Sequence, residues 1–285
     1  MSTISSRNQL IIGLPESGKT TFLAALWHVV TSEEVIGALR LAQLHGNNEY
    51  LNELHSKWIS SLPLGRTIQG SEELEIRMRL KTWEGEETTE LTFPDMSGEA
   101  FRHLWEERQW EQHYDEVARS ATGGLLFIHP NLVEHPARIA EITVPETGEA
   151  DEGAGGTGDS FIVWHASHSP TSVKLVELLQ FFAHDPDIYN LKRVAVIISA
   201  WDVVRENIAP EEWLARRLPL FDQFLKANKG RLDYQVYGIS AQGGDIETEA
   251  DRLRRPINQA ERITVIGNNC SEHDITAPVK WVADL

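Results

Sequence analysis

The sequence is poor in cysteine, in long apolar runs and in basic residues. Cys270 is the only cysteine among 285 residues, so an intrachain disulfide is excluded and no Cys/His cluster has the spacing of a zinc site. No apolar run approaches about 18 residues, which predicts that the chain has no membrane span. The opening residues, MSTISSRNQ, lack the basic and apolar regions of a signal peptide. Together these absences predict a protein of the reducing cytoplasm.

The shortage of basic residues bears on the partners of the protein. Lysine and arginine number 26 against 43 aspartates and glutamates, which gives a formal net charge of −17. A surface of this charge repels phosphate backbones and anionic lipid, so we expect neither broad nucleic-acid binding nor docking on an anionic membrane. A small anionic ligand is still allowed, because backbone amides at a local site outweigh a distant net charge.

Strand patterns and helix patterns alternate along the chain, which predicts an α/β fold. Continuous apolar runs at residues 9–13, 123–129 and 193–199 predict buried strands. The alternating pattern of residues 74–80 predicts a half-buried strand that returns as a hairpin through residues 88–93. A last strand is predicted over 235–240, and helices are predicted over 19–30, 48–59, 101–118, 173–182, 211–226 and 278–283.

The remaining segments suggest one domain with insertions. We expect a single domain over residues 1–285, with a flexible N-terminus at 1–8. The PETGEADEGAGGTGDS segment is acidic and rich in glycine, and therefore predicts a mobile loop. The expected insertions lie at about residues 32–66 and 130–170, and a C-terminal extension is expected at about 243–285.

Residues 13–20, GLPESGKT, match the pattern G-x-x-x-x-G-K-[ST] of a phosphate-binding loop. The glycines let the backbone curl so that its N–H groups face phosphates, and a helix beginning there adds the positive end of its dipole. Lys19 would place its charge on the β- and γ-phosphates, and the Thr20 hydroxyl would bind Mg²⁺. A random chain of this size matches about once in a hundred, and the strand before and helix after the match give the expected context. The predicted nucleotide-binding residues here are Gly13, Pro15, Glu16, Ser17, Gly18, Lys19, Thr20 and Thr21.

A second short motif, DMSG, follows the predicted strand 88–93 and contains Asp95 and Gly98. In a phosphate-loop protein, an acid at the end of a neighbouring strand can hold Mg²⁺ directly or through water. Gly98 can offer its N–H to the γ-phosphate. The same four residues could instead be an aspartate N-cap with a turn glycine, because D-x-x-G recurs in unrelated chains.

Two polar motifs end the last two predicted parallel strands, SAWD at residues 199–202 and SAQ at residues 240–242. Loops at the carboxyl edge of a parallel sheet are common ligand sites. The Asp202 carboxylate could accept hydrogen bonds from guanine N1 and N2, which adenine cannot offer, and a backbone N–H near Ala241 could meet guanine O6. Asp202 could also be a helix N-cap. The predicted base-side residues are Trp201, Asp202, Ser240, Ala241 and Gln242.

The ordered set GLPESGKT, DMSG, SAWD and SAQ resembles the motifs of translation-factor-class small GTPases. The phosphate loop is similar to that of the ADP-ribosylation-factor branch, and FPDMSGEAF with the ending DITAPVKW resembles the bacterial double-GTPase families associated with conflict systems. The resemblance implies a three-layer P-loop NTPase G-domain whose mostly parallel six-stranded sheet has residues 74–80 as its antiparallel edge strand. It also implies GTP and GDP as ligands, Mg²⁺ as cofactor and a protein partner. Thr67 would be the switch threonine that senses Mg²⁺ and the γ-phosphate, although it could be an ordinary loop residue.

Several positions depart from the pattern of this resemblance. Ala200 stands where the family has a lysine that packs over the base, so guanine affinity should be weakened. Glu99 stands where a water-orienting glutamine usually follows D-x-x-G, and its carboxylate is repelled by the γ-phosphate. Glu99 could act as a base, but slow intrinsic turnover is the favoured outcome. The predicted catalytic residues are Lys19, Thr67, Gly98 and Glu99.

Three functions are compatible with these motifs. The favoured function is a slow GTPase that acts as a nucleotide-dependent switch. The alternatives are a nucleotide-gated interaction module with negligible hydrolysis and an ATP-using P-loop enzyme, which the missing lysine at Ala200 would permit. Arg66 and Arg102 flank the candidate switches, where either could be an internal arginine finger or a solvated surface residue.

Overall fold

The computed structural model describes residues 8–65, 76–85, 87–93, 112–136, 165–184 and 189–285. These residues form an eight-stranded sheet in the order β2-β3-β4-β1-β5-β6-β7-β8. The strands are β1 (Asn8–Gly13), β2 (Arg40–His45), β3 (Ile76–Lys81), β4 (Thr88–Phe93), β5 (Ala121–Ile128), β6 (Arg193–Ser199), β7 (Asp233–Ser240) and β8 (Thr264–Ile266).

The sheet is parallel at its centre and antiparallel towards both edges. Strands β4, β1, β5, β6 and β7 run parallel, whereas β3 is antiparallel to both of its neighbours and β8 is antiparallel to β7. The predicted α/β class with a mostly parallel sheet is confirmed. The predicted count of six strands is wrong, because β2 and β8 extend the sheet to eight. The strand predicted at the edge is also paired on both sides, since β2 lies outside β3.

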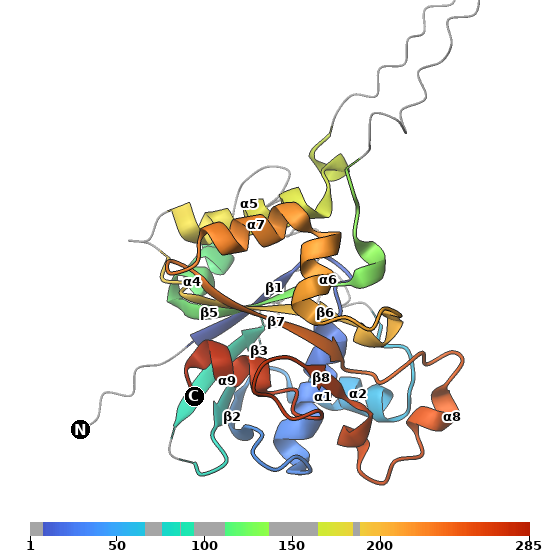
Figure 1. Cartoon of the computed structure of the whole chain (residues 1–285). Helices are drawn as coiled ribbons and strands as arrows, with labels where there is room; N and C mark the ends of the chain where they lie inside the picture. The colour runs from blue at the N-terminus through green and yellow to red at the C-terminus, as the bar shows by residue number, and fades with distance from the viewer. Residues whose placement is uncertain (1–7, 66–75, 86, 94–111, 137–164, 185–188) are drawn as a thin grey trace, which may run out of the picture.

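Helices cover both faces of the sheet and produce three layers (Figure 1). Helices α4, α5, α6 and α7 pack on one face, and α1, α2 and α9 pack on the other. The α-helices are α1 (Lys19–Ser32), α2 (Asn48–Ile59), α4 (Gln112–Ser120), α5 (Thr171–His184), α6 (Pro210–Arg217), α7 (Pro219–Ala227), α8 (Ala250–Leu253) and α9 (Ala277–Ala283). Short 3-10 helices are η1 (Pro130–Leu132), η3 (Ala166–His168), η4 (Trp201–Val203) and η5 (Gln259–Arg262).

Strand β6 shows why the central strands have continuous apolar sequences. Its residues from Val194 to Ser199 are all buried. Ala195 and Ile197 face the core under α1 and α9, whereas Val194 and Ile198 face the core under α5 to α7. A strand covered on both faces must be apolar at every position, because alternate side chains point to opposite faces.

The predicted helix over residues 211–226 is wrong as a single element. The structure has α6 and α7 instead, separated at Leu218, whose backbone angles are φ −131° and ψ 57°. Pro219 occupies the first turn of α7. Proline has no N–H to donate into a preceding turn and disfavours the helical conformation of the residue before it, so one helix cannot run through this point.

The segments predicted to be an insertion (about 32–66) and a C-terminal extension (about 243–285) contact each other. The first of them contains β2 and α2, and α2 has its predicted bounds. Buried Asp274 accepts hydrogen bonds from the Thr276 hydroxyl and the Lys280 ammonium, each at 2.5 Å. The Thr276 hydroxyl in turn accepts a bond from the Leu39 N–H at 3.0 Å. The extension is therefore tied to the chain segment that leads into β2.

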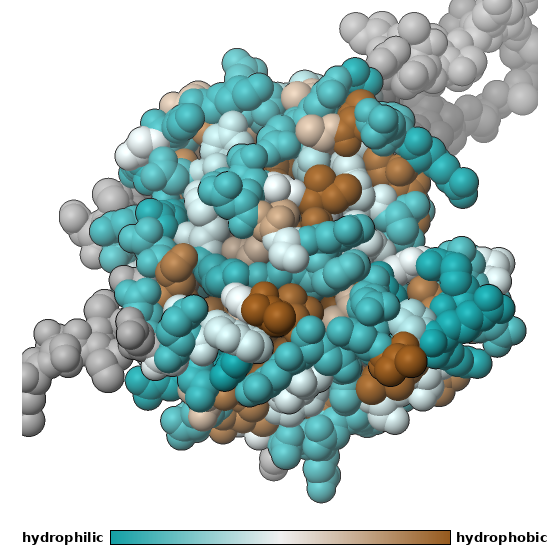
Figure 2. Space-filling model, turned by 60° about the horizontal axis from the view of Figure 1, so that its bottom comes forward, coloured by the Kyte–Doolittle hydropathy of each residue, from teal (hydrophilic) through white to brown (hydrophobic). Residues whose placement is uncertain are grey.

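The underside of the molecule is mostly hydrophilic, with small separate hydrophobic areas instead of one continuous apolar surface (Figure 2). Among the described residues, no helix combines the length and the apolar character needed to cross a membrane.

Candidate functional site

The chain leaves the sheet at Gly13 and enters α1 at Lys19 through a tightly curled loop. Gly18 has φ +91° and Glu16 has φ +60°, both in the left-handed region. A Cβ atom on Gly13 would lie 2.9 Å from the Phe127 carbonyl oxygen, and one on Gly18 would lie 2.9 Å from the Ser199 side chain. Glycine is therefore needed where the loop passes the ends of β5 and β6.

The Lys19 ammonium lies inside this loop. It donates hydrogen bonds to the carbonyl oxygens of Gly13 and Leu14, both at 2.8 Å, and to the Ser17 hydroxyl at 3.3 Å. Burial, which removes water from the amine, lowers the pKa of Lys19 to about 7. A phosphate group in the loop would favour the charged form again, because an opposite charge raises the pKa of an amine.

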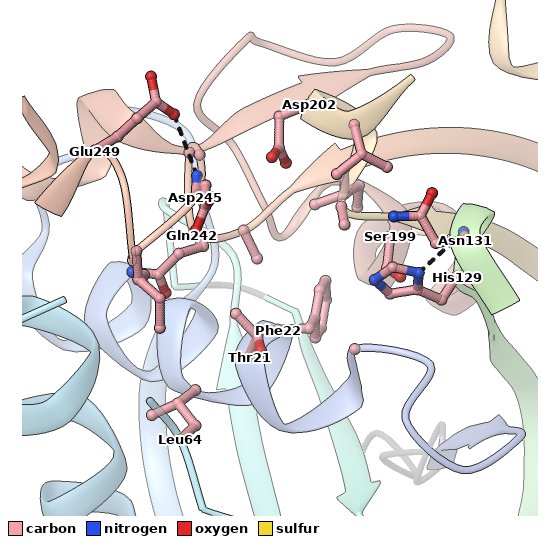
Figure 3. Close-up of a pocket in the computed structure, with 18 of the residues that line it drawn as sticks. Thr21, Phe22, Leu64, His129, Asn131, Ser199, Asp202, Gln242, Asp245 and Glu249 are labelled. Atoms are coloured by element: carbon pink, nitrogen blue, oxygen red, sulfur yellow. Dashed lines mark hydrogen bonds between the residues drawn. The ribbon is translucent and has the colours of Figure 1, made fainter. Parts of the chain in front are cut away.

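The first turn of α1 supplies two threonines. Thr20 is half-buried. Thr21 lines the cavity beside the loop, where Figure 3 shows its side chain next to Phe22. The first N–H groups of α1 have no partner within the helix, and with the helix dipole they favour an anion at this end.

A cavity of about 1170 Å³ adjoins the phosphate loop (Figure 3). Its walls come from the start of α1, the turn after α2, the carboxyl ends of β5, β6 and β7, and residues 243–252. This volume is sufficient for a nucleoside, since ligand pockets commonly measure about 300–1,000 Å³. The predicted site residues that line it are Glu16, Gly18, Thr21, Asp202, Ala241 and Gln242.

Asp202 joins the two motifs that were predicted to bind the base. It lies within η4, directly after β6, and its side chain points into the cavity (Figure 3). Its carboxylate accepts a hydrogen bond from the Ser240 hydroxyl at the end of β7. Ser240 Oγ also accepts the Gly243 N–H at 3.0 Å. The residue at the N-cap of η4 is Ala200, with φ +45°, so the alternative that Asp202 caps a helix does not hold.

Trp201 lies elsewhere. Its side chain is buried in the core under α5 to α7 and does not line the cavity. The indole packs on Gly238 of β7 so closely that a Cβ atom there would overlap it. Trp201 therefore supports the loop that carries Asp202, and its side chain is separate from the group that faces the cavity.

The structure adds cavity residues that the sequence analysis missed. His129 follows β5, and burial lowers the pKa of its imidazole, while Asp202 and Glu16 act in the opposite direction. The Asn131 N–H donates to His129 Nδ1 at 3.2 Å, so the neutral ring carries its proton on Nε2. The signal for His129 was its place after a buried strand. Arg252 and the apolar turn 62–64 also line the cavity, but no sequence pattern indicated them.

Comparison with protein families matches residues 10–282 to the family described as Double-GTPase 1. The chain belongs to the Double-GTPase 1 family. The resemblance to double-GTPase families, inferred from FPDMSGEAF and the ending DITAPVKW, is thereby confirmed. Membership in this family, together with the curled phosphate loop, supports GTP binding by the chain.

Solved structures similar to this Double-GTPase 1 chain include several GTPases. Methanosarcina barkeri Roco2 RocCORdC bound to GDP is 11% identical, with coverage of 88% of this chain and 48% of that chain and a TM-score of 0.32. The S. cerevisiae Ski7 GTPase-like domain bound to GDP and inorganic phosphate is 11% identical, with coverage of 83% and 43% and a TM-score of 0.41. The putative nucleolar GTP-binding protein 1 of Plasmodium falciparum is 12% identical, with coverage of 92% and 91% and a TM-score of 0.36.

The Double-GTPase 1 chain spans less than half the length of the first two of these proteins. At such low TM-scores the three likenesses add no argument about function. No curated protein matches the sequence.

Apart from Lys19, the predicted switch and catalytic residues of this Double-GTPase 1 chain lie outside the described residues. Strand β4 ends at Phe93, beside β1 and parallel to it, so the chain leaves the sheet on the side of the phosphate loop two residues before Asp95. The residues outside the described part are Thr67, Asp95, Gly98 and Glu99, together with the candidate arginine fingers Arg66 and Arg102. Their roles remain predictions.

Proposed function

We propose that this Double-GTPase 1 chain hydrolyses GTP to GDP and phosphate with Mg²⁺, and acts as a nucleotide-dependent switch for a protein partner. The proposal rests on the relative position of the phosphate loop and the cavity. The loop around the Lys19 ammonium and the cavity that Asp202 faces lie side by side at the carboxyl edge of the same parallel sheet. A nucleoside triphosphate across this edge places its phosphates on the loop and its base in the cavity.

The residues at the start of α1 fit a magnesium ion. Mg²⁺ keeps several waters and takes one or two protein ligands together with phosphate oxygens. Thr20 lies in the first turn of α1 directly after Lys19, where its half-buried hydroxyl would be such a ligand. Thr67 and Asp95 would complete the protein ligands. When bound, Mg²⁺ would neutralise charge on the β- and γ-phosphates.

The other predicted catalytic residues would act on the phosphates and on the attacking water. Lys19, protonated by contact with the phosphates, stabilises the charge that develops on them during in-line attack by water. The Gly98 N–H would hold the γ-phosphate. Glu99 would orient the water less well than a glutamine, because its carboxylate is repelled by the phosphate, and turnover would be slow.

Base selection rests on Asp202. A carboxylate that already accepts the Ser240 hydroxyl on Oδ1 has lone pairs left for guanine N1 and N2. Adenine offers no donor pair of this kind, so it would leave the carboxylate without these bonds. Ala200 provides no lysine stem above the base, and the affinity would therefore be lower than a lysine would allow.

The test combines binding with single-turnover hydrolysis. Purified protein would be titrated with non-hydrolysable GTP and ATP analogues in the presence of Mg²⁺, and phosphate release from GTP would then be followed at saturating protein. We expect binding of the guanine analogue alone and slow phosphate release, both abolished by Lys19→Ala.

Two outcomes would replace the proposal. Tight GTP binding without phosphate release would make the chain a nucleotide-gated interaction module. Preference for the ATP analogue would instead favour the alternative of an ATP-using P-loop enzyme. The protein partner and a cytoplasmic location stay predictions, and a pull-down that compares the GTP-analogue and GDP states would test the partner.

A further inference from the structure

We propose that Trp58 of α2 is a positioning residue for base recognition, an inference that rests on the proposed guanine binding. The Trp58 indole Nε1–H donates to the Ala241 carbonyl oxygen at 2.9 Å, and both side chains are buried. The two residues are 183 positions apart in the chain. A helix of the insertion at 32–66 thus contacts the loop that follows β7.

The geometry of the peptide bond gives this contact its consequence. The Ala241 carbonyl and the Gln242 N–H belong to one peptide plane, and in a trans peptide they point in opposite directions. The described residues contain no cis peptide bond. Holding the carbonyl against Trp58 therefore turns the Gln242 N–H away from α2. Ala241 and Gln242 both line the cavity, where such a donor is suited to guanine O6.

Trp58 is itself held from the other side. The Arg262 guanidinium carbon lies 3.6 Å from the centroid of the Trp58 ring, and its Nη2 donates to the Trp58 carbonyl oxygen. A further bond joins Arg262 Nη1 to the Ser61 hydroxyl at 3.3 Å. The Trp58 side chain is fully buried and Arg262 is 5% exposed. The attraction between this cation and the indole favours the observed orientation of the ring.

The rest of the loop has its own supports. The Ser240 hydroxyl bonds Asp202, and Arg252 Nη2 donates to the Gly243 carbonyl oxygen at 2.8 Å. One donor is left over. The Gln242 Nε2 atom is buried and has no hydrogen-bond partner within the described residues. An unsatisfied buried amide in a cavity wall points to an acceptor on a bound ligand.

Helix α2 thereby gains a role in the base site. The turn that follows it, residues 62–64, places Leu62 and Leu64 on the wall of the same cavity. The insertion would provide both the support for the donor loop and an apolar surface near the base. In this way it would compensate in part for the missing lysine at Ala200.

The test removes the indole N–H and asks whether the protein still distinguishes O6. Trp58→Phe keeps an aromatic ring for Arg262 but has no donor. The probes are GDP and 6-thio-GDP, which keeps the N1–H and the 2-amino group that Asp202 would bind and changes only O6. We expect the unmodified protein to prefer GDP by roughly three- to tenfold, the worth of one neutral hydrogen bond, and Trp58→Phe to show less than about twofold preference.

The matched control is Trp213→Phe, which changes a tryptophan of α6 that is 3% exposed in the opposite core. It should lose stability but keep the preference for GDP. If Trp58→Phe does not fold, Trp58 is exchanged for benzothienylalanine, an isostere without an N–H. An unchanged GDP preference in a folded Trp58 variant overturns the inference. Failure of the unmodified protein to prefer GDP over ADP would instead overturn the proposed function, so the two failures are distinguishable.

Discussion

Nucleotide binding should be accompanied by proton uptake at Lys19, because the pKa of its amine is lowered in the free protein. With a pKa of about 7 in the free protein, Lys19 is about nine-tenths neutral at pH 8. Phosphates bound in the loop favour the ammonium, so binding at pH 8 takes up about 0.9 proton, and at pH 7 about 0.5. Because the bound state holds the extra proton, affinity falls as pH rises above the free pKa, by roughly sixfold between pH 7 and pH 8.

The assay is isothermal titration of a non-hydrolysable GTP analogue with Mg²⁺, in buffers that differ in ionisation enthalpy, from pH 7 to 8.5. Guanosine is the matched ligand, because it has the base but no phosphate, and it should take up no proton. Burial lowers the pKa of His129, so its imidazole is mostly neutral in this window and contributes little. Proton uptake near zero at pH 8 would show that Lys19 is charged in the free protein, and would refute the reasoning.

Three further predictions concern the base site and the scaffold. Asp202→Asn should weaken GDP binding by roughly 10- to 100-fold, the worth of a charged hydrogen bond, and should favour xanthosine diphosphate in competition titrations; an unchanged base preference would remove Asp202 from the site. Gly238→Ala should lower the free energy of unfolding in urea by about 1–3 kcal/mol, since its Cβ would overlap the Trp201 indole, whereas Gly65→Ala, with open space around it, should change little. Asp274→Asn should cost about 3 kcal/mol in the same urea assay because it removes the carboxylate charge that faces the partly buried ammonium of α9, whose other acceptor is only the Gly37 carbonyl oxygen, and a loss below about 1 kcal/mol would contradict that view of the contact.

Much of the fold could be predicted because its central elements carry strong local patterns. Strands β4 and β6 and helix α2 have their predicted bounds, since apolar continuity in β6 and the amphipathic pattern of α2 each follow from burial of the element itself. The edge strands could not be predicted in the same way. Strand β2 is half-exposed and β8 has three residues, and both exist because a distant strand offers backbone partners.

The candidate site also has one part that local sequence predicts and one part that it does not. The phosphate loop is one contiguous motif whose glycines and lysine act on each other within eight residues, so its sequence was sufficient to predict its curled backbone. The cavity is assembled from separate loops. The bond between Ser240 and Asp202 joins motifs that were recognised separately, but the contact of Trp58 with Ala241 depends on how α2 packs after folding. No periodicity or motif encodes a contact of that kind.

The long sequence separation of the Trp58, Ala241 and Arg262 contacts also orders events during synthesis of the chain. The phosphate loop is complete once Thr20 has been added. The contacts that hold Trp58 against the Ala241 carbonyl also need Arg262, about 240 residues later. At a translation rate of about 5–20 residues per second, this delay is about 12–48 s. Over this interval α1, whose residues from Phe22 to Val30 are all buried in the finished fold, is covered in stages, first by β2 and α2 and last by η5. The nascent chain should therefore have a finished phosphate loop long before it has a finished base site, and should bind nucleotide only late.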